Sequence, residues 1–220
     1  MTILVSRRNH RERVAPLLAD LDLYRVFAAC FSLPSTERFA WLSGRECLVL
    51  LKKLGHYHED RLPHTATRQF RDYSSYESAY IALFEVGVPQ PPVPLLESAH
   101  SHRQVPQEIV LECVNFYDVL GLRPSGSVFP TDHLVTQLEF LAAVRYLREH
   151  ANDSNKEASL RRLEGDFIER HLLNWLPVAQ ERLEKADPPL FLNLLHSLTA
   201  YLNQQFVLLG PSDPARIMSH

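Results

Sequence analysis

Residues 131–150 read TDHLVTQLEFLAAVRYLREH, and this stretch decides the fold class. Aliphatic side chains recur in it every three or four residues, at Leu134, Leu138, Leu141, Val144 and Leu147. That spacing lines one face of an α-helix, because a helix makes one turn in about 3.6 residues. No segment of the chain shows the sustained alternation of apolar and polar residues that is typical of a half-buried strand. The sequence therefore predicts an all-α protein.

Working outward from this stretch, the same periodicity predicts further helices on both sides. They cover about 14–31, 35–54, 65–86, 107–120, 157–185 and 189–209. We expect a single bundle-like helical domain of about seven helices over residues 14–210, with flexible ends at 1–13 and 211–220. Only 7 glycines occur in 220 residues, which disfavours a β-sandwich or a Rossmann domain, whose turns and phosphate loops need positive φ.

Several of the predicted helices carry signals at their ends. Ser35, directly after Pro34, is expected to cap the helix that follows it. Gly87 and Gly121 are expected to end the helices that precede them. Pro177 should bend the long helix over 157–185, because a proline removes one backbone hydrogen bond.

A proline-rich loop covers residues 88–106. Its prolines remove five backbone donors and forbid regular helix; they are Pro89, Pro91, Pro92, Pro94 and Pro106. A connection this long is uncommon inside a compact helical domain, and long ordered loops are often functional. The loop is either a rigid connection across the end of the bundle or one wall of a groove for an extended or helical peptide.

Charge and cysteine content disfavour several functions. The formal net charge is −3 and the pI is about 6.4, whereas binding to a nucleic-acid backbone needs a basic surface. Cys30, Cys47 and Cys113 are odd in number and far apart, and no C-x-x-C pair exists. We therefore predict three reduced cysteines in the core, rather than a disulfide, an iron–sulfur cluster or a structural zinc site.

The chain shows no targeting or membrane segment. Its uninterrupted apolar runs, such as 47–51, are far short of the roughly 20 residues that span a bilayer. Arg7 and Arg8 are followed by the polar stretch 9–13, where a twin-arginine export signal would be apolar. We expect the protein to stay in the cytoplasm.

Catalytic and metal-binding motifs are missing as well. His56 with His58, and His100 with His102, lie in predicted loops without an obvious third ligand nearby, so we expect solvated histidines there and no metal. The chain contains neither G-x-S-x-G nor a G-x-x-x-x-G-K phosphate loop. These observations predict no catalytic residue, no bound cofactor and no enzymatic activity.

Asp132 and His133 form the most distinctive polar pair. They follow Pro130-Thr131 at the start of the predicted helix over 131–150. Asp132 can cap that helix, because an aspartate there accepts its free N–H groups and suits the helix dipole. The same pair can instead take part in recognition. A third alternative is a helical hydrolase or nucleotide-binding protein that uses both residues, although no phosphate loop or third ligand accompanies them.

An ordered set of short motifs extends over most of the chain. It comprises Tyr80-Ile-Ala-Leu-Phe84, the proline-rich loop ending in Leu96-Glu97-Ser98, Phe116-Tyr117 with Gly121-Leu122, Pro130-x-Asp132-His133-Leu134 with Leu138-Glu139-Phe140-Leu141, and the run Phe167 to Trp175 with His171-Leu172. In order and spacing this set resembles the TorD/DmsD/NarJ family over roughly residues 14–210. Members of that family are chaperones for complex iron–sulfur molybdoenzymes.

The resemblance implies an all-α cytoplasmic chaperone that binds the N-terminal leader of a molybdopterin-containing oxidoreductase catalytic subunit. The chaperone would hold this apo-enzyme until molybdopterin guanine dinucleotide is inserted, and so proofread twin-arginine export. It would act as a monomer or dimer. By position, the resemblance assigns leader binding to Tyr80, Phe84, Pro91, Pro92, Glu97, Ser98, Pro130, Asp132 and His133.

Two positions depart from the family pattern. Phe129 stands where an acidic residue is common, and Leu96 stands where an aromatic residue usually precedes Glu-Ser. Both changes make the expected binding patch more apolar. Within the family, the sequence looks most like the chaperones of periplasmic type II enzymes that act on dimethylsulfide, ethylbenzene, selenate or chlorate. The remaining alternative is a plain helical adaptor that has no client leader.

Overall fold

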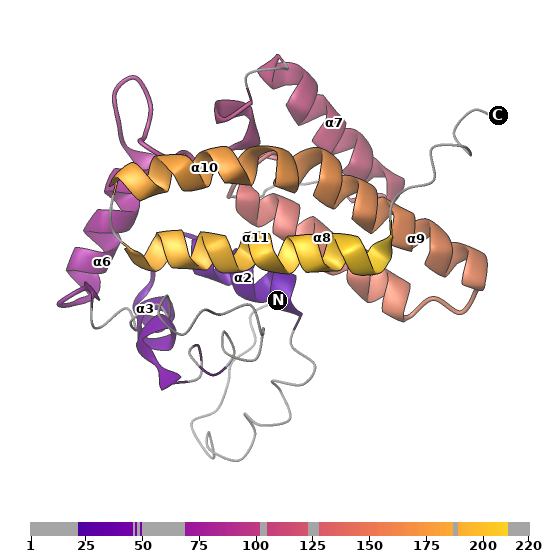
Figure 1. Cartoon of the computed structure of the whole chain (residues 1–220), viewed down its shortest axis with the longest axis horizontal. Coiled ribbons are helices and arrows are strands. Elements are labelled where there is room, and N and C mark those ends of the chain that lie inside the picture. The colour runs from indigo at the N-terminus through magenta and orange to yellow at the C-terminus, as the bar shows by residue number, and fades with distance from the viewer. Residues whose placement is uncertain are drawn as a thin grey trace.

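The computed structural model confirms an all-helical fold (Figure 1). It describes residues 22–45, 47, 49, 69–101, 105–122, 128–186 and 189–210. Within these ranges no strand occurs, and the β pairing consists of one isolated antiparallel bridge between Leu96 and His133. The expected flexible ends at 1–13 and 211–220, and the histidines His56, His58 and His102, lie outside the described residues.

The described helices follow the predicted order. They are α2 (Leu23–Phe31), α3 (Thr36–Ser43), α6 (Tyr73–Tyr80), α7 (Pro106–Val119), α8 (Leu134–Glu149), α9 (Ser154–Phe167), α10 (Leu173–Ala186) and α11 (Pro189–Leu209), with the π-helical turns η2 (Ile81–Glu85) and η4 (Ile168–Leu172) and the 3-10 turn η3 (Glu97–Ala99). The predicted range 189–209 coincides with α11. The segments α9, η4 and α10 run on without a gap, as the predicted helix over 157–185 requires.

Several predicted helix ends need correction. The helix predicted over 65–86 is interrupted at 70–72, and α6 begins at Tyr73, because Asp72 caps it in a capping box with Ser75; residues 65–68 lie outside the described residues. The helix predicted over 35–54 is capped by Ser35 as expected, but it is interrupted: α3 ends at Ser43, Gly44 is extended, and the described residues 45, 47 and 49 are again helical. The irregular turn of the long helix is η4, which ends five residues before Pro177.

The core lies between α2, α8, α9, α10 and α11. Helix α8 packs against both α2 and α9, and α10 packs along α11. Of the predicted apolar face of α8, Leu134, Leu138, Leu141 and Val144 are fully buried and Leu147 is partly buried. The three cysteines are buried and none is in a disulfide, which confirms the prediction that they are core residues.

A buried ion pair joins three of the core helices. Glu164 of α9 accepts hydrogen bonds from the hydroxyl of Tyr24 on α2 (2.9 Å) and from Nε of Arg148 on α8 (2.8 Å). The Glu164 side chain is fully buried, and this burial raises the pKa of its carboxyl group above the usual value. Both carboxylate oxygens therefore have a partner, as a buried charge requires.

Candidate functional site

Two segments that are distant in sequence pair through their backbones. The Leu134 N–H donates to the Leu95 carbonyl (2.9 Å), and the Glu97 N–H donates to the Asp132 carbonyl (3.1 Å). These bonds fasten residues 95–98, at the end of the proline-rich loop, to residues 130–134, which lead into α8. We call this arrangement the loop clamp. It explains why α8 starts at Leu134 rather than at the predicted 131.

The Asp132 side chain belongs to the clamp. Its carboxylate is almost fully buried and accepts a hydrogen bond from the backbone N–H of Ser98, in the turn η3 (3.1 Å). Asp132 therefore does not cap α8, and that alternative was wrong. No described residue donates a hydrogen bond to its second oxygen, Oδ1. This oxygen remains able to accept one from a ligand.

His133 caps α8 in its place. Its Nδ1 accepts the backbone N–H of Val135 (3.1 Å), and its ring stacks on Phe129 with the ring centroids 4.2 Å apart. Burial lowers the pKa of His133 to about 4, so the ring is neutral near pH 7. Because Asp132 and His133 bond to different segments, neither orients the other, and the pair does not form the acid–base arrangement of a hydrolase.

Further hydrogen bonds hold the second half of the clamp from α7 and α8. The Tyr117 hydroxyl donates to the carbonyl of Thr131 (2.6 Å). The Thr136 hydroxyl donates to the carbonyl of Pro130 (2.9 Å). The ring of Pro130 stays exposed, so this segment offers an apolar surface on a backbone that is fixed from behind.

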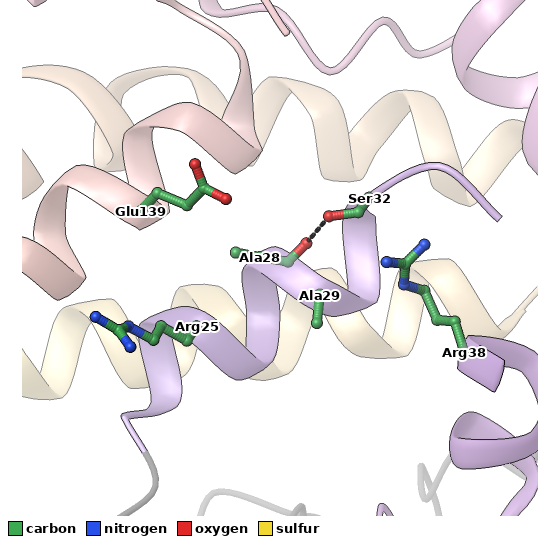
Figure 2. Close-up of a pocket in the computed structure, with 6 residues that line it drawn as sticks. All are labelled: Arg25, Ala28, Ala29, Ser32, Arg38 and Glu139. Atoms are coloured by element: carbon green, nitrogen blue, oxygen red, sulfur yellow. Dashed lines mark hydrogen bonds between the residues drawn. The ribbon is translucent and has the colours of Figure 1, made fainter. Parts of the chain in front are cut away.

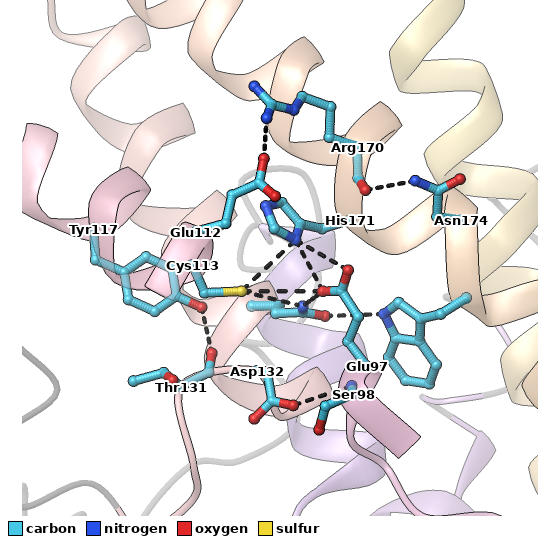
Figure 3. A network of polar contacts seen from close by, with 12 residues as sticks. Glu97, Ser98, Glu112, Cys113, Tyr117, Thr131, Asp132, Arg170, His171 and Asn174 are labelled. Carbon is cyan, nitrogen blue, oxygen red and sulfur yellow. Dashed lines mark hydrogen bonds and ion pairs between the residues drawn. The ribbon is translucent and has the colours of Figure 1, made fainter. Parts of the chain in front are cut away.

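Beneath the clamp lies a buried polar network around Glu97 (Figure 3). Its carboxylate lies 2.9 Å from Nδ1 of His171 and accepts a hydrogen bond from the Gln137 amide (2.5 Å). Trp175 donates its indole N–H to the other end of Gln137, at Oε1 (3.2 Å). The thiol of Cys113 lies 4.0 Å from Glu97 and 3.7 Å from His171. Burial and the Glu97 charge together raise the pKa of this thiol.

Tyr80 and Phe84 lie in a different environment. They contact each other edge to face, at 5.0 Å between ring centroids, and Phe84 also packs against Phe191 at 5.1 Å. The Tyr80 hydroxyl donates to the carbonyl of Phe31 (2.8 Å). Both side chains are buried in this aromatic cluster. The structure therefore does not bring them onto one surface with Pro92 and Pro130, which are exposed.

The proline-rich loop is anchored at its start. The Val93 N–H donates to the Leu83 carbonyl in η2 (2.9 Å). Gly87 fits because a Cβ atom there would lie 2.2 Å from the carbonyl oxygen of Gln90. Pro91 is partly buried, and Pro92 is exposed. In its described part, residues 88–101, the loop is therefore fixed by hydrogen bonds and close packing.

Exposed apolar side chains are frequent in the stretch of sequence that contains the proline-rich loop and α7. Most of the large apolar residues that the described chain exposes lie between 81 and 128: Ile81, Val86, Val88, Val105, Leu111, Val119, Leu122 and Val128. Figure 1 shows the loop after α6 and helix α7 at the same edge of the molecule, beyond α10. Val88 is 99% exposed and Val128 is 77% exposed. Exposed apolar groups that gather in one region are typical of an interaction surface.

Two hollows lie elsewhere, beside α2 and α3. One has a volume of about 480 Å³ and is lined by Arg25, Ala28, Ala29, Ser32, Arg38 and Glu139 (Figure 2). A neighbouring hollow of about 610 Å³ shares Arg25 and Arg38 with it. Carboxylates accompany these two arginines, Glu139 in the first hollow and Asp22 with Glu37 in the second, so the lining carries both signs of charge.

The structure also corrects the prediction for His100 and reveals residues that the motifs did not bring together. His100 is buried, not solvated: its Nε2 lies 2.6 Å from the Pro94 carbonyl, and its ring stacks on Trp175 at 5.2 Å. His171 and Trp175 belonged to a recognised run, but nothing in the sequence linked them to Glu97. Nothing in the sequence marked Gln137 as a site residue, because the role of a glutamine on an apolar helix face depends on partners from other elements.

Comparisons with known proteins agree on one family. The family model described as "Nitrate reductase delta subunit" matches residues 56–180. The selenate reductase assembly chaperone protein of Thauera selenatis is 37% identical over 52% of this chain and 61% of its own length. The chlorate reductase assembly chaperone protein of Ideonella dechloratans is 35% identical over 50% of this chain and 58% of its own length. The match thus spans about three fifths of each of these relatives.

Two further matches cover more of the chain. The perchlorate reductase assembly chaperone protein of Dechloromonas aromatica is 26% identical over 77% of this chain and 80% of its own length. A crystal structure of a putative redox enzyme maturation protein from Archaeoglobus fulgidus superimposes with a TM-score of 0.50, at 19% identity, over 82% of this chain and 92% of that one. The structural match confirms the fold. Among the described helices, none is both long and apolar enough to cross a membrane.

Proposed function

Since the chain belongs to the nitrate reductase delta subunit family, we propose that it is an assembly chaperone, without catalytic activity of its own, for the catalytic subunit of a molybdopterin-containing iron–sulfur oxidoreductase. The names of its relatives support this function, because three of them are assembly chaperones of selenate, chlorate and perchlorate reductases. In this proposal the chain binds the N-terminal leader of the apo-enzyme in the cytoplasm, before cofactor insertion and twin-arginine export.

The observation that carries leader binding is the exposed apolar surface around the loop clamp. Within the clamp Pro130 is exposed and Leu96 is partly exposed on a backbone that is hydrogen-bonded from behind, and the exposed Val128 lies two residues before Pro130. A leader that contains an apolar segment would bury these side chains, and a few such anchors suffice for a micromolar complex of about −8 kcal/mol. Leu111 and Val119 lie two turns apart on the outer face of α7, and Ile109, Cys113 and Tyr117 line its inner face. The outer face of α7 can therefore extend the surface.

The nine residues expected at the leader site take two roles in this proposal. Pro91, Pro92, Ser98 and Pro130 are at least partly accessible and can touch the leader. The five buried residues hold the surface in shape from below: Tyr80, Phe84, Glu97, Asp132 and His133. Asp132 also offers Oδ1 to a leader arginine, because only its other carboxylate oxygen is bonded to Ser98.

Affinity capture tests the proposed client class. The tagged chain is expressed in its native host, and captured proteins are identified by mass spectrometry. We expect one molybdopterin-binding catalytic subunit that carries an N-terminal leader. The matched control replaces two exposed apolar residues, V88S together with V128S, which should preserve the fold and reduce capture. Equal capture by both chains would argue against this surface, and capture of no such subunit would argue against the function.

A further inference from the structure

Three potential metal ligands converge below the loop clamp. Glu97 comes from η3, Cys113 from α7 and His171 from η4, so three elements distant in sequence each contribute one donor atom (Figure 3). All three side chains are buried, and their donor atoms lie within 4.8 Å of one another. The three ligands share no local sequence motif, which is why no metal site was expected from the sequence.

The separations between the donor atoms are close to those of a tetrahedral site. Zinc bonds of about 2.3 Å to sulfur and 2.0–2.2 Å to nitrogen or oxygen put ligand atoms about 3.3–3.6 Å apart. The observed separations are 3.7 Å from Cys113 Sγ to His171 Nδ1, 4.0 Å from Sγ to Glu97 Oε2, and 2.9 Å from Oε2 to Nδ1. Shifts of about half an ångström therefore suffice to place all three atoms around one ion.

The donor set also selects the kind of ion. One thiolate, one imidazole nitrogen and one carboxylate oxygen suit Zn²⁺ and similar divalent transition metals, whereas Mg²⁺ and Ca²⁺ prefer oxygen alone. A divalent cation would offset the repulsion between the two negatively charged ligands, the Cys113 thiolate and the Glu97 carboxylate, and the thiol would release its proton when the ion binds.

The surroundings hold these ligands in place. Trp175 orients the Gln137 amide so that its NH₂ group faces both Glu97 Oε2 (2.5 Å) and Cys113 Sγ (3.8 Å). Such N–H groups commonly support carboxylate and thiolate ligands from behind. The rings of Phe116 and Phe167 lie against the His171 imidazole, at 5.3 and 4.7 Å between centroids. The same Gln137 contact also satisfies Glu97 when no metal is bound.

We propose that Glu97, Cys113 and His171 form a binding site for Zn²⁺ or a related divalent transition metal. Three protein ligands leave a fourth coordination position for water or another donor. The ion would tie η3, α7 and η4 together directly under the loop clamp. Metal binding at this site does not depend on the client that the chain serves, so the proposal stands or falls separately from the chaperone function.

Cobalt provides the direct test, because a Co²⁺–thiolate bond gives a sulfur-to-metal charge-transfer absorption. The full chain is stripped with a chelator and titrated with Co²⁺, then with Zn²⁺. We expect the absorption to saturate at one equivalent, to disappear when Zn²⁺ displaces Co²⁺, and to be accompanied by a rise in the melting temperature. A titration that gives neither the absorption nor the melting shift would overturn the proposal.

Two cysteine variants test whether Cys113 supplies the thiolate that gives the Co²⁺ absorption. Cys113→Ser should lose the absorption, and Cys30→Ser, which removes another buried thiol away from the cluster, should keep it. Glu97→Gln should weaken Co²⁺ binding at least tenfold while the thiolate absorption remains detectable at high Co²⁺. Because the wild-type titration needs no variant, a variant that fails to fold leaves the test intact. An absorption that survives in folded Cys113→Ser would overturn the assignment.

Discussion

Asp132 and His133 are neighbours in sequence, yet their side chains serve different parts of the clamp. Asp132 reaches across to the Ser98 N–H, and His133 turns back to cap its own helix at Val135. Sequence reasoning recognised the pair and considered capping by Asp132 as one alternative, whereas in the structure His133 is the capping residue. An aspartate has the stronger capping preference, and only the backbone pairing of 95–97 with 132–134 shifts the helix start by three residues.

The variant Asp132→Asn tests whether the Asp132 carboxylate contributes to leader binding or only to the stability of the clamp. The asparagine Oδ1 can still accept the Ser98 N–H, so the melting temperature should stay the same. If Asp132 meets a leader arginine, loss of its charge should weaken leader binding about ten- to a hundredfold, the equivalent of about 1.5–3 kcal/mol. Calorimetric titration with the client's leader peptide measures the effect. Unchanged affinity would exclude the arginine contact.

His133 should make stability depend on pH. Burial lowers its pKa from 6.5 to about 4, so the unfolded state binds a proton more readily than the folded state. The stabilisation is therefore complete above pH 6.5 and is lost as the pH falls toward 4. The total loss corresponds to about 3 kcal/mol of unfolding free energy. Urea unfolding at pH 7 and pH 5 measures the part of this loss that falls between these two pH values, about 2 kcal/mol.

His133→Asn is the matched control for this pH dependence. Asparagine caps a helix about as well as any residue but does not titrate in this range. The difference in unfolding free energy between pH 7 and pH 5 should therefore be smaller in the variant by about 2 kcal/mol. An identical difference in both proteins would show that His133 is not held neutral by burial.

At the scale of elements, the periodicity of apolar residues predicted the helices. It could not predict which side chains from different helices come into contact. The range of α11 and the continuous helix through α9 and α10 followed from long apolar stripes. The burial of His100 depended on Trp175, which is 75 positions further along the chain. The network of Glu97 with Gln137 and His171 likewise needs three elements packed together. A local sequence pattern cannot predict contacts between side chains of different elements.

Gly87 tests whether the shape of the proline-rich loop matters. A Cβ atom at this position would lie 2.2 Å from the Gln90 carbonyl oxygen, so Gly87→Ala must displace the loop backbone. We expect a loss of about 1–3 kcal/mol in unfolding free energy and weaker leader binding. Gly165→Ala is the control, because its Cβ atom would make ordinary contacts at 3.8 Å in α9. The control should be neutral or gain up to about 1 kcal/mol; equal effects of both variants would contradict this account.

At the scale of the whole molecule, Glu164 joins α2, α8 and α9 in the core. Glu164→Leu leaves the Arg148 guanidinium and the Tyr24 hydroxyl without their buried partner. We expect this variant to lose about 3 kcal/mol in unfolding free energy, measured by chemical denaturation. The exposed pair of Arg145 with Glu149 supplies the control, and Glu149→Ala should change stability by less than about 0.5 kcal/mol. Similar losses in both variants would mean that Glu164 does not hold the helices together.

Leader recognition by the intact chain is the central claim, and titration calorimetry tests it most directly. The chain is titrated with a synthetic peptide of the leader from the captured catalytic subunit, and separately with a peptide of equal length from the mature part of that subunit. The account predicts one site with micromolar affinity for the leader, weakened in the V88S and V128S double variant, and no binding of the mature peptide. Equal binding of both peptides, or no binding of the leader by a folded chain, would contradict it.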